Sequence, residues 1–163
     1  NPSLENKEAV AHAVGVGAVI FHDLKNDRTN NFDFALEEVV QFEGETGPYV
    51  QYTHARAMSI LRKANHTVDT KAAFSLTDDD AWEVLKLIEN YPNVVRFAEE
   101  KCEPSAIAKF VINLAQAFNK YYAHTKVLVE DEAFNSRIAL VQTTASILKQ
   151  GLALLGVAAP DEM

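Results

Sequence analysis

Two adjacent tyrosines, Tyr121 and Tyr122, have side chains suited to binding a nucleic acid. They lie in the segment AFNKYYAH, residues 117–124. Single-stranded RNA is recognised by stacking its bases on aromatic faces and by hydrogen bonds to the base edges. Neighbouring side chains on a helix point about 100° apart, so one tyrosine can face the core while the other faces solvent. Alternatively, Tyr121 simply continues the apolar stripe of Phe118, with its hydroxyl at the rim.

No grouping of residues predicts catalysis or a metal site. The histidines are scattered without the i, i+4 spacing of metal ligands, and each is expected at the surface or its boundary. They are His12, His22, His54, His66 and His124. Cys102 falls on an apolar face and lacks a nucleophile signature. The acidic run Asp78–Asp80 has a structural role at a helix start, and no phosphate-binding glycine loop is present.

The segment EGETGPYVQYTHARAMSILRK, residues 43–63, predicts the helix around which the other elements are arranged. Pro48 suits a first helical position, with Thr46 or Gly47 as the N-cap. Apolar residues recur at three- and four-residue spacing from Val50 to Ala64 and form one face. Aromatic, cationic and polar side chains occupy the opposite face: Tyr52, Arg56, Ser59 and Lys63. This second face is either a binding surface or an ordinary solvated one.

Periodicity and caps predict an all-α protein, a bundle of about five helices with an N-terminal helical appendage. Thr77 is the expected N-cap of a helix that ends at Tyr91, because the residue before Pro92 avoids the α region. Gly15 and Gly17 suggest close packing of the first helix. The expected helical ranges are 4–24, 35–41, 48–65, 77–91, 93–101, 105–127 and 132–155.

The composition limits the possible partners and location. No apolar run is long enough to span a membrane, and the single cysteine fits a cytoplasmic protein. Because the chain begins at Asn1 rather than Met, we expect a piece of a longer protein. The formal net charge of −8 opposes nucleic-acid binding unless the fold gathers the 15 Lys and Arg residues on one side. Charge alone favours an acidic helical module that binds another protein.

Two long stretches resemble bacterial-type arginyl-tRNA synthetases, which are class I enzymes. Residues 43–63 resemble the passage from the catalytic domain to the helical anticodon-binding domain of that family. The end of the chain resembles the family's C-terminus in Arg137–Val141, Leu148–Gly156 and Pro160–Met163. The resemblance implies that residues 1–45 end a catalytic domain and residues 46–163 form the anticodon-binding domain. A related domain from the cysteine or glycine enzyme is an alternative, although GETGPYVQYTHAR favours arginine.

The resemblance also implies a function. The whole enzyme would join arginine to its tRNA with ATP, through an arginyl-adenylate. The HIGH and KMSKS signatures are absent here, so ATP and Mg²⁺ belong to the missing catalytic domain and this chain should be inactive alone. Its implied partners are the anticodon arm of tRNA(Arg) and that catalytic domain, with no membrane.

The family pattern further implies which residues bind tRNA. An aromatic residue and the extreme C-terminus flank the anticodon in these enzymes, and Tyr121, Tyr122 and Met163 match those positions. A chain end at Met163 without a disordered tail fits a terminus held in a site. The turn from Phe42 to Pro48 resembles a loop that approaches the anticodon arm. Four further residues are candidates on the same basis: Tyr49, Tyr52, Arg56 and Arg137.

Overall fold

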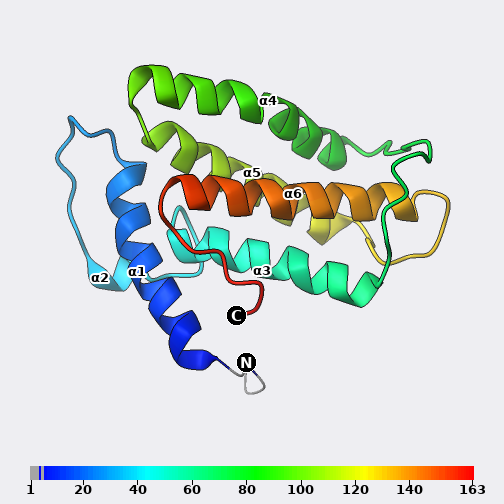
Figure 1. The fold of residues 1–163 in the computed structure, drawn as a ribbon, viewed down its shortest axis with the longest axis horizontal. Helices are drawn as coiled ribbons and strands as arrows, with labels where there is room; N and C mark the ends of the chain where they lie inside the picture. Colours follow the sequence, from blue (N-terminus) through cyan, green and yellow to red (C-terminus); the bar gives the residue numbers. More distant parts are fainter. Residues whose placement is uncertain (1–3, 5) are drawn as a thin grey trace.

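The computed structural model describes residue 4 and residues 6–163, and in these residues all regular structure is helical. Figure 1 shows α3 to α6 running alongside one another, with α1 lying across one end of them. The predicted all-α class is therefore confirmed. Glu5, inside the expected first helix, lies outside the described residues, as do residues 1–3. The helices are α1 Lys7–Lys25, α2 Leu36–Val39, α3 Gly47–Ala64, α4 Asp79–Lys101, α5 Ser105–His124 and α6 Phe134–Leu154.

Helix α3 begins and ends where its sequence predicts. The side chain of Thr46 accepts a hydrogen bond from the backbone N–H of Tyr49 at 3.2 Å, which makes Thr46 the N-cap. Pro48 occupies the first turn, where its missing N–H leaves no hydrogen bond unmade. The helix stops at Asn65, which adopts the left-handed conformation with φ 43°. The face carrying Tyr52 and Arg56 is thereby held in a fixed orientation.

Helix α4 corrects two expectations about where it begins and ends. Its N-cap is Asp78, whose carboxylate accepts from the N–H of Ala81 at 2.7 Å, and not Thr77. It also continues through Pro92 to Lys101, so the two helices predicted there are one. A proline inside a helix costs about 3 kcal/mol because one hydrogen bond is lost. Packing against the core on both sides of the proline, by Ile88 and Val95 among others, offsets this cost. The ring of Tyr91 also stacks on that of Phe110 in α5, with ring centres 5.3 Å apart.

Cys102 ends α4 and does not lie on an apolar face as expected. It adopts the left-handed conformation with φ 50°, and its side chain is exposed. Cys102 is therefore the C-cap of α4, whereas apolar patterning had assigned it to the core.

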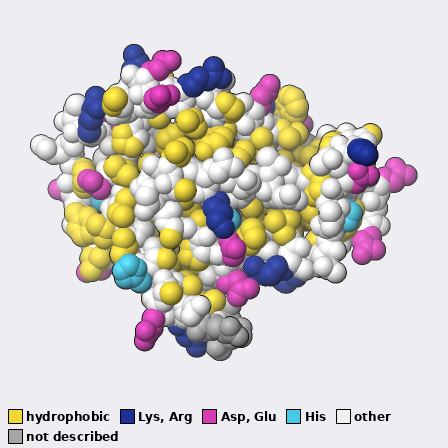
Figure 2. All heavy atoms as spheres, in the orientation of Figure 1, with side chains coloured by type: hydrophobic (Ala, Val, Ile, Leu, Met, Phe, Trp, Pro, Cys, Tyr) yellow, Lys and Arg dark blue, Asp and Glu magenta, His cyan; other side chains and the backbone are white. Residues whose placement is uncertain are grey.

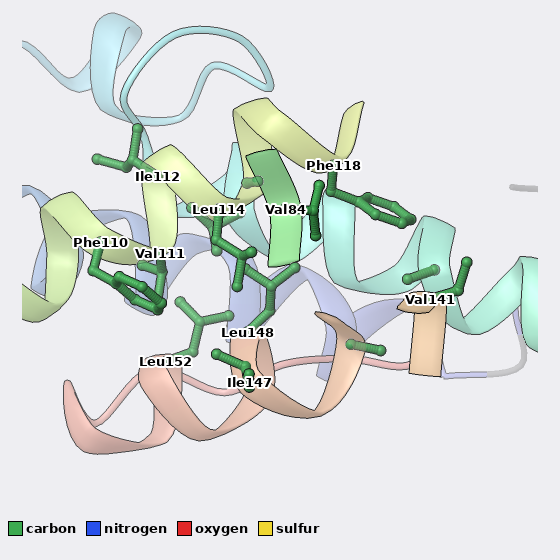
Figure 3. Close-up of a cluster of buried hydrophobic side chains, with 14 of the residues drawn as sticks. Val84, Phe110, Val111, Ile112, Leu114, Phe118, Val141, Ile147, Leu148 and Leu152 are labelled. Atoms are coloured by element: carbon green, nitrogen blue, oxygen red, sulfur yellow. The ribbon is translucent and has the colours of Figure 1, made fainter. Parts of the chain in front are cut away.

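The core is centred on α5. Figure 3 shows Phe110, Leu114 and Phe118 on this helix directed towards side chains of α4 and α6. Helices α5 and α6 approach closely at Gly151, where an added Cβ would collide with Cγ1 of Val111. None of the helices described combines the length and apolar character that crossing a bilayer requires.

Helix α1, in the expected N-terminal appendage, packs into this core. It contacts α3 and α5, and Phe21 is fully buried in the main hydrophobic cluster. The helices α1 and α3 cross at Gly17 and Gly47, where an added Cβ would lie 2.8 Å from a neighbouring side chain in each case. The close packing expected at Gly17 is therefore confirmed. It is wrong for Gly15, which has nothing within 4 Å of an added Cβ.

Candidate nucleic-acid interface

A pocket of about 430 Å³ brings together four of the residues that the sequence singled out. Tyr52 and Arg56 come from α3, and Tyr122 comes from the last turn of α5. Met163, in the C-terminal tail, also lines the pocket. The tail leaves α6, crosses α3 and ends beside it (Figure 1). Residues far apart in the sequence thus meet at one site.

Arg56 lies between two aromatic rings in this pocket. Its guanidinium carbon is 4.9 Å from the ring centre of Tyr52 and 5.7 Å from that of Tyr122. The two tyrosines are 40% and 41% exposed, so both rings remain accessible to a ligand. Phe42 meets Tyr52 edge to face, with ring centres 6.1 Å apart. Aromatic rings and a planar guanidinium side by side suit the stacking of unpaired bases.

Asn119 fixes this arrangement, and sequence reasoning missed it. Its side-chain amide donates to the hydroxyl of Tyr49 at 3.0 Å and to Oγ1 of Thr53 at 2.8 Å. Its carbonyl oxygen accepts a hydrogen bond from Arg56. One amide therefore joins α5 to α3 and sets the position of the guanidinium. A polar residue three positions before Tyr122 was the available signal, since i and i+3 share a helix face.

Two of the predicted residues support the fold around the pocket. Tyr121 is fully buried, and burial raises the pKa of its phenol. The pattern left this core position open as an alternative, but it placed the hydroxyl at the rim, and that part is wrong because the hydroxyl is buried as well. Arg137 is also buried and donates to the carbonyls of Val127 and Val129. It holds the pKa of Asp131 below its usual range through a 2.8 Å ion pair.

Arg137 therefore shapes the loop between α5 and α6, and this loop supplies Leu128 to the pocket wall. A second hollow of about 530 Å³ shares Tyr122 and Leu128 with the first. Tyr122 consequently stands between two adjoining depressions.

The tail that carries Met163 is held by side chains of α3 and α6. Gln51 donates to the carbonyl of Ala158 at 2.7 Å, and Arg62 donates to the carbonyl of Asp161 at 3.1 Å. His54, expected at the surface or its boundary, is instead buried with 1% exposure. That prediction is wrong because the tail covers the ring and because α6 offers it a backbone carbonyl.

Cationic side chains at the pocket outnumber acidic ones, in contrast to the whole chain. Arg56, Arg62 and Lys63 line it, and Glu162 is the one acidic side chain among its lining residues. Elsewhere Figure 2 shows basic and acidic side chains interspersed on the face it presents, with no extended basic patch. Across the described residues, no group of three or more histidine, cysteine or acidic side chains is arranged to hold a metal. The site is thus a small cationic and aromatic hollow on an acidic protein.

Comparison with known proteins agrees with this geometry. A profile of the family described as DALR anticodon binding domain matches residues 50–163. An arginine–tRNA ligase of Enterococcus faecalis is 65% identical over 163 residues, which make up 100% of this chain and 29% of that protein. One from Streptococcus thermophilus is 59% identical over the same shares. The chain therefore spans less than a third of the length of these curated relatives.

Solved structures show the same relationship in three dimensions. The arginyl-tRNA synthetase of Thermus thermophilus matches with a TM-score of 0.92 and 36% identity, over 100% of this chain and 29% of that one. That of Plasmodium falciparum matches with a TM-score of 0.90 and 25% identity, over 98% of this chain and 29% of that one. With the family match over residues 50–163, these agreements show that the chain belongs to the DALR anticodon-binding domain family and has the fold of the corresponding part of arginyl-tRNA synthetases.

Proposed function

We propose that this chain binds the anticodon loop of an arginine tRNA in the pocket between α3, α5 and the C-terminal tail. One observation carries the proposal: Arg56 lies between two accessible tyrosine rings, 4.9 Å and 5.7 Å away. In this arrangement Tyr52 and Tyr122 offer stacking faces, while Arg56 offers hydrogen-bond donors to base edges or phosphate. Met163 closes the pocket with a flexible apolar side chain that adapts to the shape of a base.

The other candidate residues act indirectly in this proposal. Tyr49 contributes through Asn119, which holds Arg56. Tyr121 and Arg137 support the core and the loop that carry Tyr122 and Leu128. The division of the chain at residues 45 and 46 remains a prediction. Helix α1 shares the core with α3 across it.

We infer that the whole protein is an arginine–tRNA ligase. The curated relatives bear that name, and this favours arginine over cysteine or glycine. The ATP and Mg²⁺ that such a ligase requires would bind in the remaining part, which would also be the same-chain partner of this domain. Because tRNA serves protein synthesis in the cytoplasm, we propose that location. A docking module for another protein is not favoured, since the family match is to an anticodon-binding domain.

The test is a titration of this chain with the anticodon stem-loop of an arginine tRNA at low salt. Tyr122→Ala removes an exposed stacking face and should weaken binding by about tenfold, since stacking on an aromatic ring contributes about 1–3 kcal/mol per base. Phe97→Ala is the matched control, because Phe97 is also an exposed aromatic residue, lies on α4 and does not line the pocket.

A stem-loop with altered anticodon bases completes the design. The proposal holds if the altered loop and Tyr122→Ala both bind more weakly while Phe97→Ala binds as the unmodified chain does. Equal, salt-sensitive binding of both loops would leave only nonspecific electrostatic attraction. No binding, or equal losses in Tyr122→Ala and Phe97→Ala, would reject the pocket as the anticodon site.

A further inference from the structure

The tail that brings Met163 to the pocket has no helical structure beyond Gly156, so side-chain contacts determine its position. One of these contacts is made by a buried side chain, that of His54. The ring of His54 lies between α6 and the tail, with Nδ1 3.1 Å from the carbonyl oxygen of Ala145 and Nε2 3.0 Å from Oδ1 of Asp161. This histidine therefore bridges the last helix and the segment that follows it.

Both atoms facing the ring are hydrogen-bond acceptors. A backbone carbonyl oxygen accepts and cannot donate. The carboxylate of Asp161 is ionised at neutral pH, because hydrogen bonds from His54 and then Lys149 hold its pKa below the ordinary value. An ionised carboxylate also only accepts. A neutral imidazole has one N–H and one bare nitrogen, so it would point a lone pair at one of these oxygens.

The charges around the ring are consistent with a proton on each nitrogen. Asp161 supplies the negative charge, and its Oδ1 is also 3.2 Å from the ammonium nitrogen of Lys149 on α6. Arg62 on α3 binds the backbone of Asp161 and forms an ion pair with Glu162 at 3.3 Å. The two cations oppose protonation of His54, whereas the two carboxylates favour it. Only Asp161 among the four touches the ring directly.

We propose that His54 is a positioning residue for the RNA pocket: as an imidazolium it donates to Ala145 and to Asp161, and so holds Met163 against Tyr52, Arg56 and Tyr122. This rests on the proposed function for the role of the pocket, and on geometry alone for the protonation. Without the second proton, one of the two hydrogen bonds is lost and the tail loosens. Arg62 and Lys149 still hold it in part.

Two nuclear magnetic resonance signals test the proposal without RNA. In chain labelled with ¹⁵N-histidine, both ring nitrogens of His54 should be protonated at the pH where the tail is docked. His54→Gln identifies the signal by its loss. The methyl signal of Met163 should shift over the same pH range as His54 loses its proton. The only other methionine, Met58 on α3, serves as the internal control.

Asp161→Asn is the decisive variant, because an amide can donate to a bare nitrogen or accept from an N–H. His54 should then become neutral, and the pH-linked shift of Met163 should vanish. Glu162→Gln is the matched control, since Glu162 pairs with Arg62 and not with His54. It should keep the pH-linked shift of Met163. A bare nitrogen on His54 in the docked chain, or the same Met163 shift in Asp161→Asn, would overturn the proposal.

Binding of the anticodon stem-loop, measured over the pH range in which these two signals change, then connects the bridge made by His54 to function. Affinity should fall by about tenfold as the charge-assisted hydrogen bond is lost, and this dependence should be absent in Asp161→Asn. If no stem-loop binds at any pH, the proposed function fails, while the two resonance signals still decide the role of His54. If RNA binds but its affinity is independent of pH, His54 does not position the pocket.

Discussion

Tyr121 and Tyr122 are neighbours on α5, yet the helix directs one into the core and the other towards solvent. The hydroxyl of Tyr121 is buried, and none of the described residues offers it a hydrogen-bond partner. Burial raises the pKa of this phenol, so the group is neutral at physiological pH. A buried polar atom without a partner costs stability while the ring around it contributes packing. The hydroxyl of Tyr121 therefore lowers the stability of the fold, whereas its ring raises it.

Tyr121→Phe should leave the free energy of unfolding unchanged or raise it by about 1 kcal/mol, because it removes only the unpartnered hydroxyl. Tyr121→Ala should lower it by about 3–5 kcal/mol, because it leaves a cavity in the core. Urea denaturation followed by circular dichroism measures both. Tyr122→Phe, at the exposed neighbour, is the control and should change little. A clear loss of stability in Tyr121→Phe would show that the hydroxyl has a bonding partner after all.

At the scale of single residues, the sequence indicated which side chains suit an RNA site better than it indicated which other side chains they contact. Helical geometry correctly separates the two tyrosines but does not say which one turns inwards, since that depends on how α5 is rotated against α4 and α6. His54 and Asn119 were missed for a related reason. Each is defined by a contact with a distant segment, Asp161 for one and Tyr49 for the other. Spacing within one helix carries no information about such contacts.

Among the helices, α4 shows where local sequence signals fail to predict the end of a helix. Pro92 is a strong stop signal, and propensity alone splits the helix there. Residues on both sides of the proline, such as Ile88 and Val95, pack against the core, and this packing keeps the helix continuous to Lys101. The helices without an internal proline were predicted to within a few residues. Apolar spacing and caps agree in them, whereas in α4 the tertiary packing overrides the local signal.

The crossing of α1 and α3 gives a prediction at this scale. Gly47→Ala would bring a methyl group 2.8 Å from Cβ of Phe21 and 3.0 Å from the carbonyl oxygen of Gly17. The helices must then separate, which should lower the free energy of unfolding by about 1–3 kcal/mol. Thermal unfolding followed by circular dichroism measures the change.

Gly15→Ala is the matched control on α1. An added Cβ there meets nothing within 4 Å, and alanine favours a helix interior over glycine by about 0.5–1 kcal/mol. It should therefore raise the unfolding temperature. If Gly47→Ala were as stable as the unmodified chain, the helices would not be in close contact at this crossing.

The whole molecule presents a conflict between its charge and its proposed ligand. A net charge of −8 repels RNA at long range, whereas the pocket gathers Arg56, Arg62 and Lys63. Composition describes the long-range field and cannot locate three cations at one hollow. This is why charge alone favoured a protein partner. Affinity in such a site should come mainly from stacking and base-edge contacts, with a small share from phosphate neutralisation.

The salt dependence of RNA binding measures how much of the affinity comes from phosphate neutralisation. Each phosphate neutralised on a single strand contributes about −0.7 to the slope of log K against log salt concentration. Three cations therefore predict a slope no steeper than about −2 for the anticodon stem-loop, because screening of the acidic surface acts in the opposite sense. Lys63→Gln should make the slope shallower by about 0.7. A slope steeper than about −4 would mean that cations outside the pocket contact the RNA.

The docked tail also has a consequence for the order in which the molecule folds. Gln51 and His54 bind tail residues that lie 107 positions further along the chain. Closing so long a loop costs chain entropy before any contact forms, so distant pairings tend to form late. Helices α3 and α6 must first be side by side to present Gln51, His54 and Ala145. During refolding, the capacity to bind RNA should therefore appear after helical structure has recovered.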